Sequence, residues 1–328
     1  MTSRIAVVCG GPSSEAAVSR ASGRGVQQAL IKAGYAAELL ELGRELPAAL
    51  LAGNFDAVFP TTHGPLGEDG CLQGLLEVLG VPYVGSGVLG SATAASKPAA
   101  KRCFREAGLP VAPERVVKQS ELDALDCDAI IAELGPAVVV KPSGGGSSIG
   151  VQRLAEGSDG AALREALLRS FKVDSEALIE RFVTGLEVTC GVLEGEAGPV
   201  AFSPTLIHSN AAEWYDFKSR YGTGGSRHEC PAPLPLARLG RIQSIAVAAF
   251  KAVSARDLGR MDFVVPADPA VDVTLLEVNT LPGMTATSLY PEAAGVAGID
   301  FPELCQRLVE RAKARPARYV PEEVPLPD

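Results

Sequence analysis

Two stretches in the C-terminal third, GRMDFVVP and TLLEVNT, place acidic side chains where they can hold a metal ion. Because side chains alternate between the two faces of a strand, Arg260 and Asp262 share one face of the first stretch. By the same alternation, Glu277 and Asn279 share one face of the second. If the strands pair as a hairpin, three oxygen-bearing side chains converge, and such oxygens are the ligands that Mg²⁺ prefers beside substrate phosphates. The alternative is a solvated strand face that carries an Arg–Asp pair.

A second stretch, VVVKPSGGGSSIG at 138–150, runs from an apolar strand through Lys141 into a loop of glycines and serines. The chain contains no GK[ST], which excludes a Walker-type phosphate loop, and the glycine spacing fits neither the dinucleotide-binding nor the kinase pattern. Backbone N–H groups of such a loop can approach a phosphate, and Ser147 and Ser148 add hydroxyl donors. A flexible surface turn is the alternative. The presence of the acidic hairpin in the same chain favours a metal–ATP site.

The whole-chain composition limits the class of partner. The 328 residues are 47% apolar and 21% charged, with a formal net charge of −9, as in a folded protein of two or three domains. An acidic chain is a poor general binder of nucleic acid or of anionic membranes. The N-terminal residues lack an apolar signal core and no later run is long enough to cross a bilayer, so we expect a cytoplasmic protein. Seven cysteines without a C-x-x-C pair predict neither a disulfide framework nor a zinc site.

Alternating strand and helix patterns predict a parallel α/β domain over residues 1–95. Expected strands lie at Ile5–Cys9, at Ala36–Leu40, at Asp56–Thr61 and in VPYVG. A helical pattern follows the first strand, and another, with four leucines between positions 72 and 79, precedes VPYVG. This order favours a parallel sheet with helices on its faces.

The remaining chain is predicted to form two α+β domains, 96–183 and 184–318, and a proline-rich tail at 319–328. The first contains helices near 99–107 and 159–171 and strands near 111–117, in VVVKP, in GVQRL and in ALIERFV. The second contains the strand EVTCGVL, a helix at about 237–255 and the acidic hairpin. The glycine loop and the acidic hairpin therefore belong to different domains.

Several ordered motifs together resemble the D-alanine:D-alanine ligase family of the ATP-grasp superfamily. They are GGPSSEAAVS, HGPLGEDGCLQGLLEVLGVPYVGSGVLGSA, KPSGGGSSIGV, IER, EWYDFKSRY, GRMDF and EVNTLPGMTATSLYP. The resemblance implies an ATP-grasp fold, in which an N-terminal parallel α/β domain precedes two α+β domains that clasp ATP. It also implies a homodimer.

The resemblance implies a two-step reaction that uses ATP, two D-alanines and two Mg²⁺ or Mn²⁺ ions. The carboxylate of one D-alanine attacks the γ-phosphate to give D-alanyl phosphate and ADP, and the amine of a second D-alanine then displaces phosphate. The product, D-alanyl-D-alanine, serves peptidoglycan precursor synthesis. Such chemistry needs positive charge around the phosphoryl oxygens and protection of the acyl phosphate from water.

Site residues implied by the resemblance fall into three groups. Those that contact the nucleotide are Lys97, Lys141, Ser147, Ser148, Glu180, Val183, Glu187 and Arg220, and the metal ligands are Asp262, Glu277 and Asn279. Those that act on the substrates or the intermediate are Glu15, His63, Ser147, Tyr221, Arg260, Gly283, Ser288 and Leu289. Spacing alone would make Glu15 a helix N-cap or a surface acid, and His63 a turn residue.

Some residues depart from the family pattern and leave other functions open. Arg220 stands where the family commonly has Lys, Ser96 stands where Asp is usual before Lys97, and GTGGSRHE at 222–229 is unusual. The alternatives are a ligase that joins D-alanine to D-lactate or D-serine, a natural-product ligase, a carboxylase-type ATP-grasp enzyme and a non-catalytic nucleotide-binding regulator. Tyr221 favours peptide formation over depsipeptide formation, although His208 and His228 nearby leave that question open. The three intact metal ligands disfavour the regulator.

Overall fold

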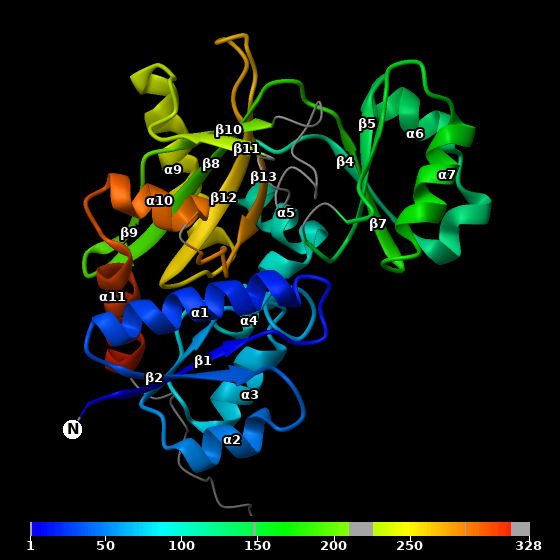
Figure 1. Ribbon diagram of the computed structural model, residues 1–328. Coiled ribbons are helices and arrows are strands. Elements are labelled where there is room, and N and C mark those ends of the chain that lie inside the picture. The colour runs from blue at the N-terminus through cyan, green and yellow to red at the C-terminus, as the bar shows by residue number, and fades with distance from the viewer. Residues whose placement is uncertain (1, 147–148, 210–225, 286, 316–328) are drawn as a thin grey trace, which may run out of the picture.

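The computed structural model describes residues 2–146, 149–209, 226–285 and 287–315. Three sheets form the framework (Figure 1). Ser147, Ser148, Arg220 and Tyr221 lie outside the described residues. Among the helices of the described part, none has the length and apolar character needed to cross a bilayer.

The N-terminal sheet is parallel, as predicted, with strand order β2-β1-β3. Its elements are β1 (Arg4–Cys9), α1 (Ala16–Lys32), β2 (Ala36–Glu41), α2 (Leu46–Gly53), β3 (Ala57–Pro60) and α3 (Cys71–Leu79). The VPYVG strand was predicted too generously, because only one bridge, between Val58 and Tyr83, forms there. Pro82 cannot donate a ladder hydrogen bond, and Gly85 at a φ of +101° turns the chain away.

The middle sheet is antiparallel, with strand order β4-β7-β5-β6. Helices α6 and α7 pack on it around one hydrophobic core, and α4 and α5 lead into it. The elements are α4 (Val88–Ala95), α5 (Lys97–Glu106), β4 (Glu114–Lys118), η1 (Gln119–Ala124), α6 (Cys127–Leu134), β5 (Val138–Pro142), β6 (Gln152–Leu154), α7 (Gly160–Ser170) and β7 (Glu176–Arg181). The glycine loop connects β5 to β6.

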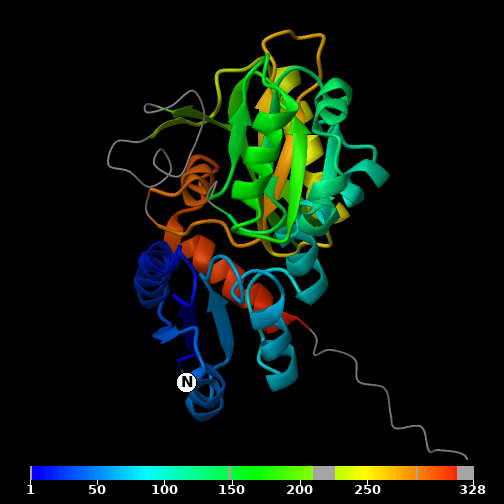
Figure 2. The ribbon, with the colours of Figure 1, turned by 90° about the vertical axis from the view of Figure 1, so that its right-hand side faces the viewer.

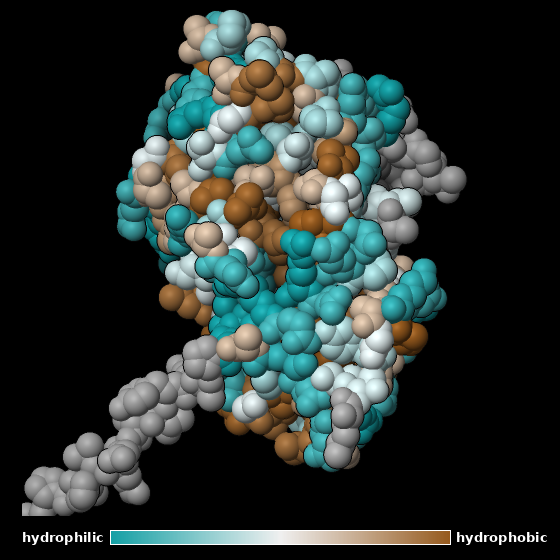
Figure 3. All heavy atoms as spheres, turned by 90° about the vertical axis from the view of Figure 1, so that its left-hand side faces the viewer, coloured by the Kyte–Doolittle hydropathy of each residue, from teal (hydrophilic) through white to brown (hydrophobic). Residues whose placement is uncertain are grey.

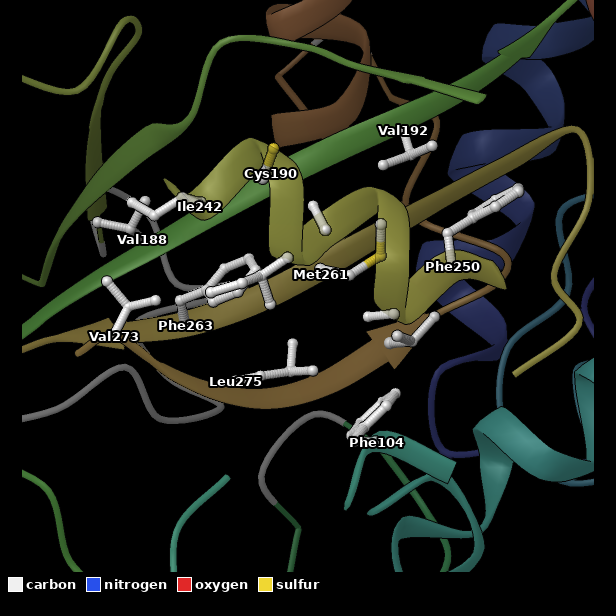
Figure 4. Packing of buried hydrophobic residues seen from close by; sticks show 14 of the residues in the cluster. Phe104, Val188, Cys190, Val192, Ile242, Phe250, Met261, Phe263, Val273 and Leu275 are labelled. Atoms are coloured by element: carbon white, nitrogen blue, oxygen red, sulfur yellow. The ribbon is translucent and has the colours of Figure 1, made fainter. Parts of the chain in front are cut away.

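The C-terminal sheet is antiparallel, with order β11-β10-β8-β12-β13 and with β9 beside β8. Its elements are β8 (Leu186–Gly195), β9 (Gly198–Ala201), β10 (Thr205–Ser209), β11 (Ser226–Glu229), α9 (Leu236–Ala252), β12 (Leu258–Val265) and β13 (Thr274–Asn279), followed by α10 (Leu289–Val296) and α11 (Phe301–Ala314). One face of the β12–β13 hairpin packs into a core beneath α9, where Met261, Phe263 and Leu275 meet Phe250 of α9 and Phe104 of α5 (Figure 4). The register of β13 shifts at Leu276, so its core residues Leu275 and Val278 do not alternate strictly. The opposite residues of the hairpin are therefore left to face the site.

The last helix, α11, leaves the C-terminal part and lies against α1 and β3 of the N-terminal part (Figure 2). Its apolar stripe, which includes Leu304, Leu308 and Val309, joins the core that contains Ile5 and Val7 of β1. The N-terminal domain therefore depends on a helix from the other end of the chain. On the face that Figure 3 shows, hydrophobic side chains gather in the upper half and a hydrophilic band crosses the middle.

Candidate active site

The acidic hairpin forms as predicted. Strands β12 and β13 pair antiparallel, with Arg260 opposite Asn279 and Asp262 opposite Glu277. Asp262 accepts hydrogen bonds from Arg260 Nε at 2.9 Å and Nη2 at 2.8 Å, and from Asn279 Nδ2 at 3.2 Å. Thr189 of β8 donates a fourth, at 2.8 Å. The Arg–Asp pair considered as an alternative is present, but both side chains are largely buried, so the face is not a solvated one.

The donor chemistry of this face fits Mg²⁺. Asp262, Glu277 and Asn279 supply only oxygen ligands, and cross-strand neighbours lie close enough to share one ion. Within the described residues no group of three or more His, Cys, Asp or Glu side chains gathers as a closed metal site. Two carboxylates and an amide instead suit an ion that completes its shell with water and substrate phosphates.

A cavity of about 410 Å³ lies between the middle and C-terminal sheets. Lys141 of β5 and Glu277 of β13 both line it, as do Glu180, Val183 and Glu187. Its wall also includes the apolar side chains of Val139, Phe182 and Leu276 and the backbone of Gly144–Gly146. One end is therefore suited to a flat apolar base and the other to phosphates.

Glu180 lies between two lysines within this wall. Its Oε2 is 2.5 Å from Lys141 Nζ, and its Oε1 forms an ion pair with Lys101 Nζ. Burial alone would raise the pKa of Glu180, but the two ammonium groups outweigh that effect and lower the pKa to about 2. Burial alone would likewise lower the pKa of Lys141, but Glu180 reverses the shift and raises it. Both groups are therefore charged at neutral pH.

Lys97 approaches the phosphate end from the N-terminus of α5. Ser96 caps this helix by accepting from Ala99 N, at 3.4 Å, so its side chain has a helix-starting role. The Lys97 ammonium donates to Gly145 O at 2.7 Å. Burial lowers the pKa of Lys97, an effect that attraction to Glu277 opposes and repulsion from Lys141 reinforces. The charged form of Lys97 is thus disfavoured by burial, and a bound anion would stabilise it.

The base of the glycine loop is fixed by acids that the sequence did not single out. Gly144 N donates to Asp174 Oδ2 at 2.7 Å, and Ser143 Oγ donates to Glu176 at 3.0 Å. Gly145 has a φ of +86°, in the region that favours glycine. These contacts hold the start of the loop over the cavity.

A second cavity, of about 310 Å³, adjoins the first between the N-terminal domain and the hairpin. Lys97 and Glu277 line both cavities, and Asn279 and Gly64 line the second. A ligand phosphate in the first cavity would therefore lie next to a small compartment. Its size suits small molecules of a few heavy atoms.

Glu15, where α1 begins, does not line this compartment but lies close to two residues that do, Gly64 and Gly146. It occupies the N-cap position, but its carboxylate makes no capping hydrogen bond and is buried. Instead it approaches the glycine loop, because a Cβ added to Gly146 would be 3.1 Å from Glu15 Oε2. His63 is also buried, with its Nδ1 3.9 Å from Glu68, and its Nε2 has no hydrogen-bond partner among the described residues.

The loop after β13 brings Gly283 and Ser288 together. A Cβ on Gly283 would lie 2.9 Å from Ser288 Oγ, and that hydroxyl accepts from Thr285 N at 3.0 Å. Leu289 follows as the first, buried residue of α10. Several predicted site residues line neither of the two cavities: Glu15, His63, Arg260, Asp262, Gly283, Ser288 and Leu289.

Sequence reasoning missed Lys101, Asp174 and Thr189, which hold other site residues in place. The spacing of Lys101 four residues after Lys97 on an amphipathic helix was a usable signal, because residues four apart share a helix face. Nothing local in the sequence pointed to Asp174 or Thr189.

Comparisons with known proteins show the family of this chain. Residues 103–310 match the family model "D-ala D-ala ligase C-terminus" and residues 43–86 match "D-ala D-ala ligase N-terminus". The chain is 44% identical to a D-alanine–D-alanine ligase of Acidiphilium cryptum over 95% of this chain and 99% of that protein. It is 40% identical to one from Anaeromyxobacter over 94% and 96%.

Solved structures give the same result for the fold. A D-alanine–D-alanine ligase from Bacillus anthracis superposes with a TM-score of 0.81 at 32% identity, covering 95% of this chain and 97% of that one. The same enzyme complexed with ATP gives 0.80 at 31%, with the same coverage. The chain therefore has the ATP-grasp fold and belongs to the D-alanine–D-alanine ligase family.

Proposed function

We propose that this protein joins two D-alanines to D-alanyl-D-alanine with ATP, releasing ADP and phosphate, and so supplies peptidoglycan precursor synthesis. The observation that carries the proposal is the cavity that Lys141 of the middle sheet and Glu277 of the C-terminal hairpin line together. A Mg-nucleotide needs cationic donors on one side and acidic oxygens on the other, and this cavity has both.

In the proposed complex the adenine lies against the apolar wall near Val183, with Glu180 and Glu187 as its polar partners. Lys97 and Lys141 receive the phosphates, together with the backbone N–H groups of the glycine loop and the side chains of Ser147, Ser148 and Arg220. Two lysines near one polyphosphate reduce the repulsion that an attacking carboxylate would meet.

Asp262, Glu277 and Asn279 would hold two Mg²⁺ or Mn²⁺ ions. When bound, the metal would supply positive charge beside the phosphates and neutralise the negative charge that develops there. Thr189 and Arg260 hold the Asp262 carboxylate in one orientation on the hairpin face. That orientation aligns Asp262 with Glu277 before any ligand enters.

The first proposed step takes place where the two cavities meet. Glu15 binds the ammonium group of the first D-alanine, and His63 lies beside it. A carboxylate oxygen of this D-alanine forms a bond to the γ-phosphorus while the bond to the ADP oxygen breaks. Lys97 lines both cavities, so its ammonium can stay in contact with the phosphoryl oxygens during the transfer. Ser147 and Tyr221 complete the cover that keeps water from the acyl phosphate.

In the second proposed step the amine of another D-alanine attacks the acyl carbon. A C–N bond forms, the C–O bond to phosphate breaks, and the amine loses a proton. Arg260 and the Gly283 N–H stabilise the oxyanion of the tetrahedral intermediate. Ser288 binds the carboxylate of the second D-alanine beside Leu289, a role supported by the contact between Gly283 and Ser288.

The test is an assay of ADP release with D-alanine as the sole amino acid, followed by mass analysis of the product. We expect D-alanine-dependent ADP release and a dipeptide product. ADP release only when D-lactate or D-serine is added, or no D-alanine-dependent release, would contradict the proposal.

We further propose that the enzyme works in the cytoplasm, where ATP is made, and as a homodimer. Exposed apolar side chains on adjacent helices of the N-terminal domain, Leu51, Val78 and Leu89, support a contact surface between copies. Sedimentation equilibrium should give twice the chain mass of 33.9 kDa. A mass of one chain at micromolar concentration would contradict the dimer.

A further inference from the structure

Helix α5 carries three cationic side chains in one row, Lys97, Lys101 and Arg105, spaced four residues apart. Another face of the helix carries Ala100 and Phe104, which enter the core of the C-terminal sheet (Figure 4). The apolar face therefore fixes the rotation of the helix, and the cationic row is held toward β4 and β7 of the middle sheet.

Lys101 is the buried member of this row, with 1% of its side chain exposed. Its ammonium contacts Glu180 of β7 and lies 3.3 Å from Glu114 of β4. Arg105 forms an ion pair with Glu114 from the solvent side. A lysine buried to this degree is costly unless acids compensate it, and here two do.

Because Glu180 pairs with two lysines, only part of its negative charge offsets the positive charge of Lys141. Glu180 places one oxygen on Lys101 and the other on Lys141. Glu114 is in turn shared between Lys101 and Arg105. Within this network the two lysines balance the two glutamates, and Arg105 adds one further positive charge. Glu187 and Glu277, which line the same cavity as Lys141, are acids outside the network and are the same with or without Lys101. Without Lys101, Glu180 would pair with Lys141 alone and Glu114 with Arg105 alone, so the network would lose its one surplus positive charge.

We propose that Lys101 is a positioning residue for nucleotide binding: by sharing Glu180, it lowers the share of that carboxylate's negative charge that offsets Lys141, and so leaves more of the Lys141 charge for the ATP phosphates. Lys101 lines neither cavity, so it acts through Glu180 and not by contact. The inference rests on the proposed function for the identity of the nucleotide. The effect of Lys101 on nucleotide affinity should grow with the number of phosphates, because the interaction energy of the nucleotide with Lys141 scales with the nucleotide's charge.

The test measures the Kd of ATP and of AMP by titration calorimetry for the wild type and Lys101→Met. Methionine matches the unbranched length of lysine without the charge. We expect the Kd of ATP to rise about tenfold and that of AMP about twofold at the same ionic strength. Lys101→Arg should bind ATP within about threefold of the wild type, because the charge is kept.

Glu114→Gln is the matched control. It breaks the same network but leaves Lys101 wholly to Glu180, so ATP binding should be unchanged or tighter. Equal losses for ATP and AMP in Lys101→Met, or a similar loss in Glu114→Gln, would show a structural role and overturn the inference. If Lys101→Met does not fold, Lys101→Arg and Glu114→Gln still test the role of Lys101. Weaker ATP binding in Glu114→Gln than in the wild type would contradict that role. A wild type that binds ATP but releases no ADP with D-alanine would overturn the proposed function alone.

Discussion

Glu180 shows how single residues of the site depend on charge partners far away in the sequence. It is almost fully buried and remains ionised because Lys101 and Lys141 flank it. The sequence could predict Lys141 and Glu180 as nucleotide residues through family motifs. It could not show that Glu180 is shared with Lys101, because the pairing depends on the packing of α5 against β7.

Glu180→Gln should therefore destabilise the fold in a pH-dependent way. The folded-state pKa of Glu180 is lowered from 4.5 to about 2, so its stabilisation is present above 4.5 and is lost as pH falls toward 2. We expect a loss of roughly 3 kcal/mol at neutral pH, which shrinks across that acidic window. Urea unfolding at several pH values measures it, with Glu165→Gln on the exposed face of α7 as control. A difference from the wild type that is constant with pH would contradict the assignment.

The lowered pKa of Lys97 makes a second residue-scale prediction. The ammonium is present below that pKa, so ATP affinity should decline as pH rises through it, before an ordinary lysine would titrate. Because the pKa of Lys141 is raised, Lys141 should stay charged over the same range. ATP titrations from neutral to strongly alkaline pH test this, and Lys97→Met should remove the decline while binding more weakly throughout. A decline that persists unchanged in Lys97→Met would refute it.

At the scale of elements, the β12–β13 hairpin was predictable and several other features were not. Alternation along GRMDFVVP and TLLEVNT predicted both strands and the face that Asp262 and Glu277 share, and these two residues lie opposite each other. Strict alternation fails at Leu276, because the register shifts there and Leu276 lines the cavity together with Glu277. The helix α11 was missed, although Leu304, Leu308 and Val309 follow a helical pattern. Its packing partner α1 lies almost 300 residues earlier, and no local pattern shows that pairing. The VPYVG segment was predicted as a full strand because its apolar residues favour one, although Pro82 and Gly85 disfavour a strand there.

The contact between the glycine loop and α1 gives an element-scale prediction. In Gly146→Ala the new Cβ would be 3.1 Å from Glu15 Oε2, so either the loop or Glu15 must shift. Since Glu15 is the proposed ligand of the first D-alanine, the KM for D-alanine should rise about tenfold while the KM for ATP changes by less than about threefold. Steady-state kinetics measure both. Gly43→Ala, which meets open space, is the control. A larger effect on ATP than on D-alanine would be evidence against this contact.

At the scale of the whole molecule, three sheets meet around one pair of adjoining cavities. The middle sheet supplies Lys141 and the C-terminal sheet supplies Glu277 to the first cavity, and Glu15, at the start of α1, approaches the glycine loop from the N-terminal domain. The helix α5 touches both antiparallel sheets, and α11 fixes the C-terminal part to the N-terminal core. The sequence predicted the three parts but not this cross-chain packing, which requires knowing which apolar stripes face each other.

Leu308→Ala tests the dependence of the N-terminal core on α11. Leu308 is fully buried between the two parts, so its truncation should cost about 2–5 kcal/mol of unfolding free energy. Denaturant unfolding gives the value, and Leu236→Ala on the exposed side of α9 should change it by less than about 0.5 kcal/mol. Equal effects of the two substitutions would contradict the packing.

The central claim is that Lys141 and Glu277 act on the same bound nucleotide. The most direct measurement is a double-mutant cycle of Lys141→Met and Glu277→Gln, with D-alanine-dependent ADP release as the readout. Residues that act on one transition state are non-additive. We expect each single substitution to lower kcat/KM for ATP by about 100-fold or more, and the double variant to lose clearly less than the product of the two losses. Wild-type kcat/KM in either single variant, or fully independent losses in the double variant, would contradict the shared site.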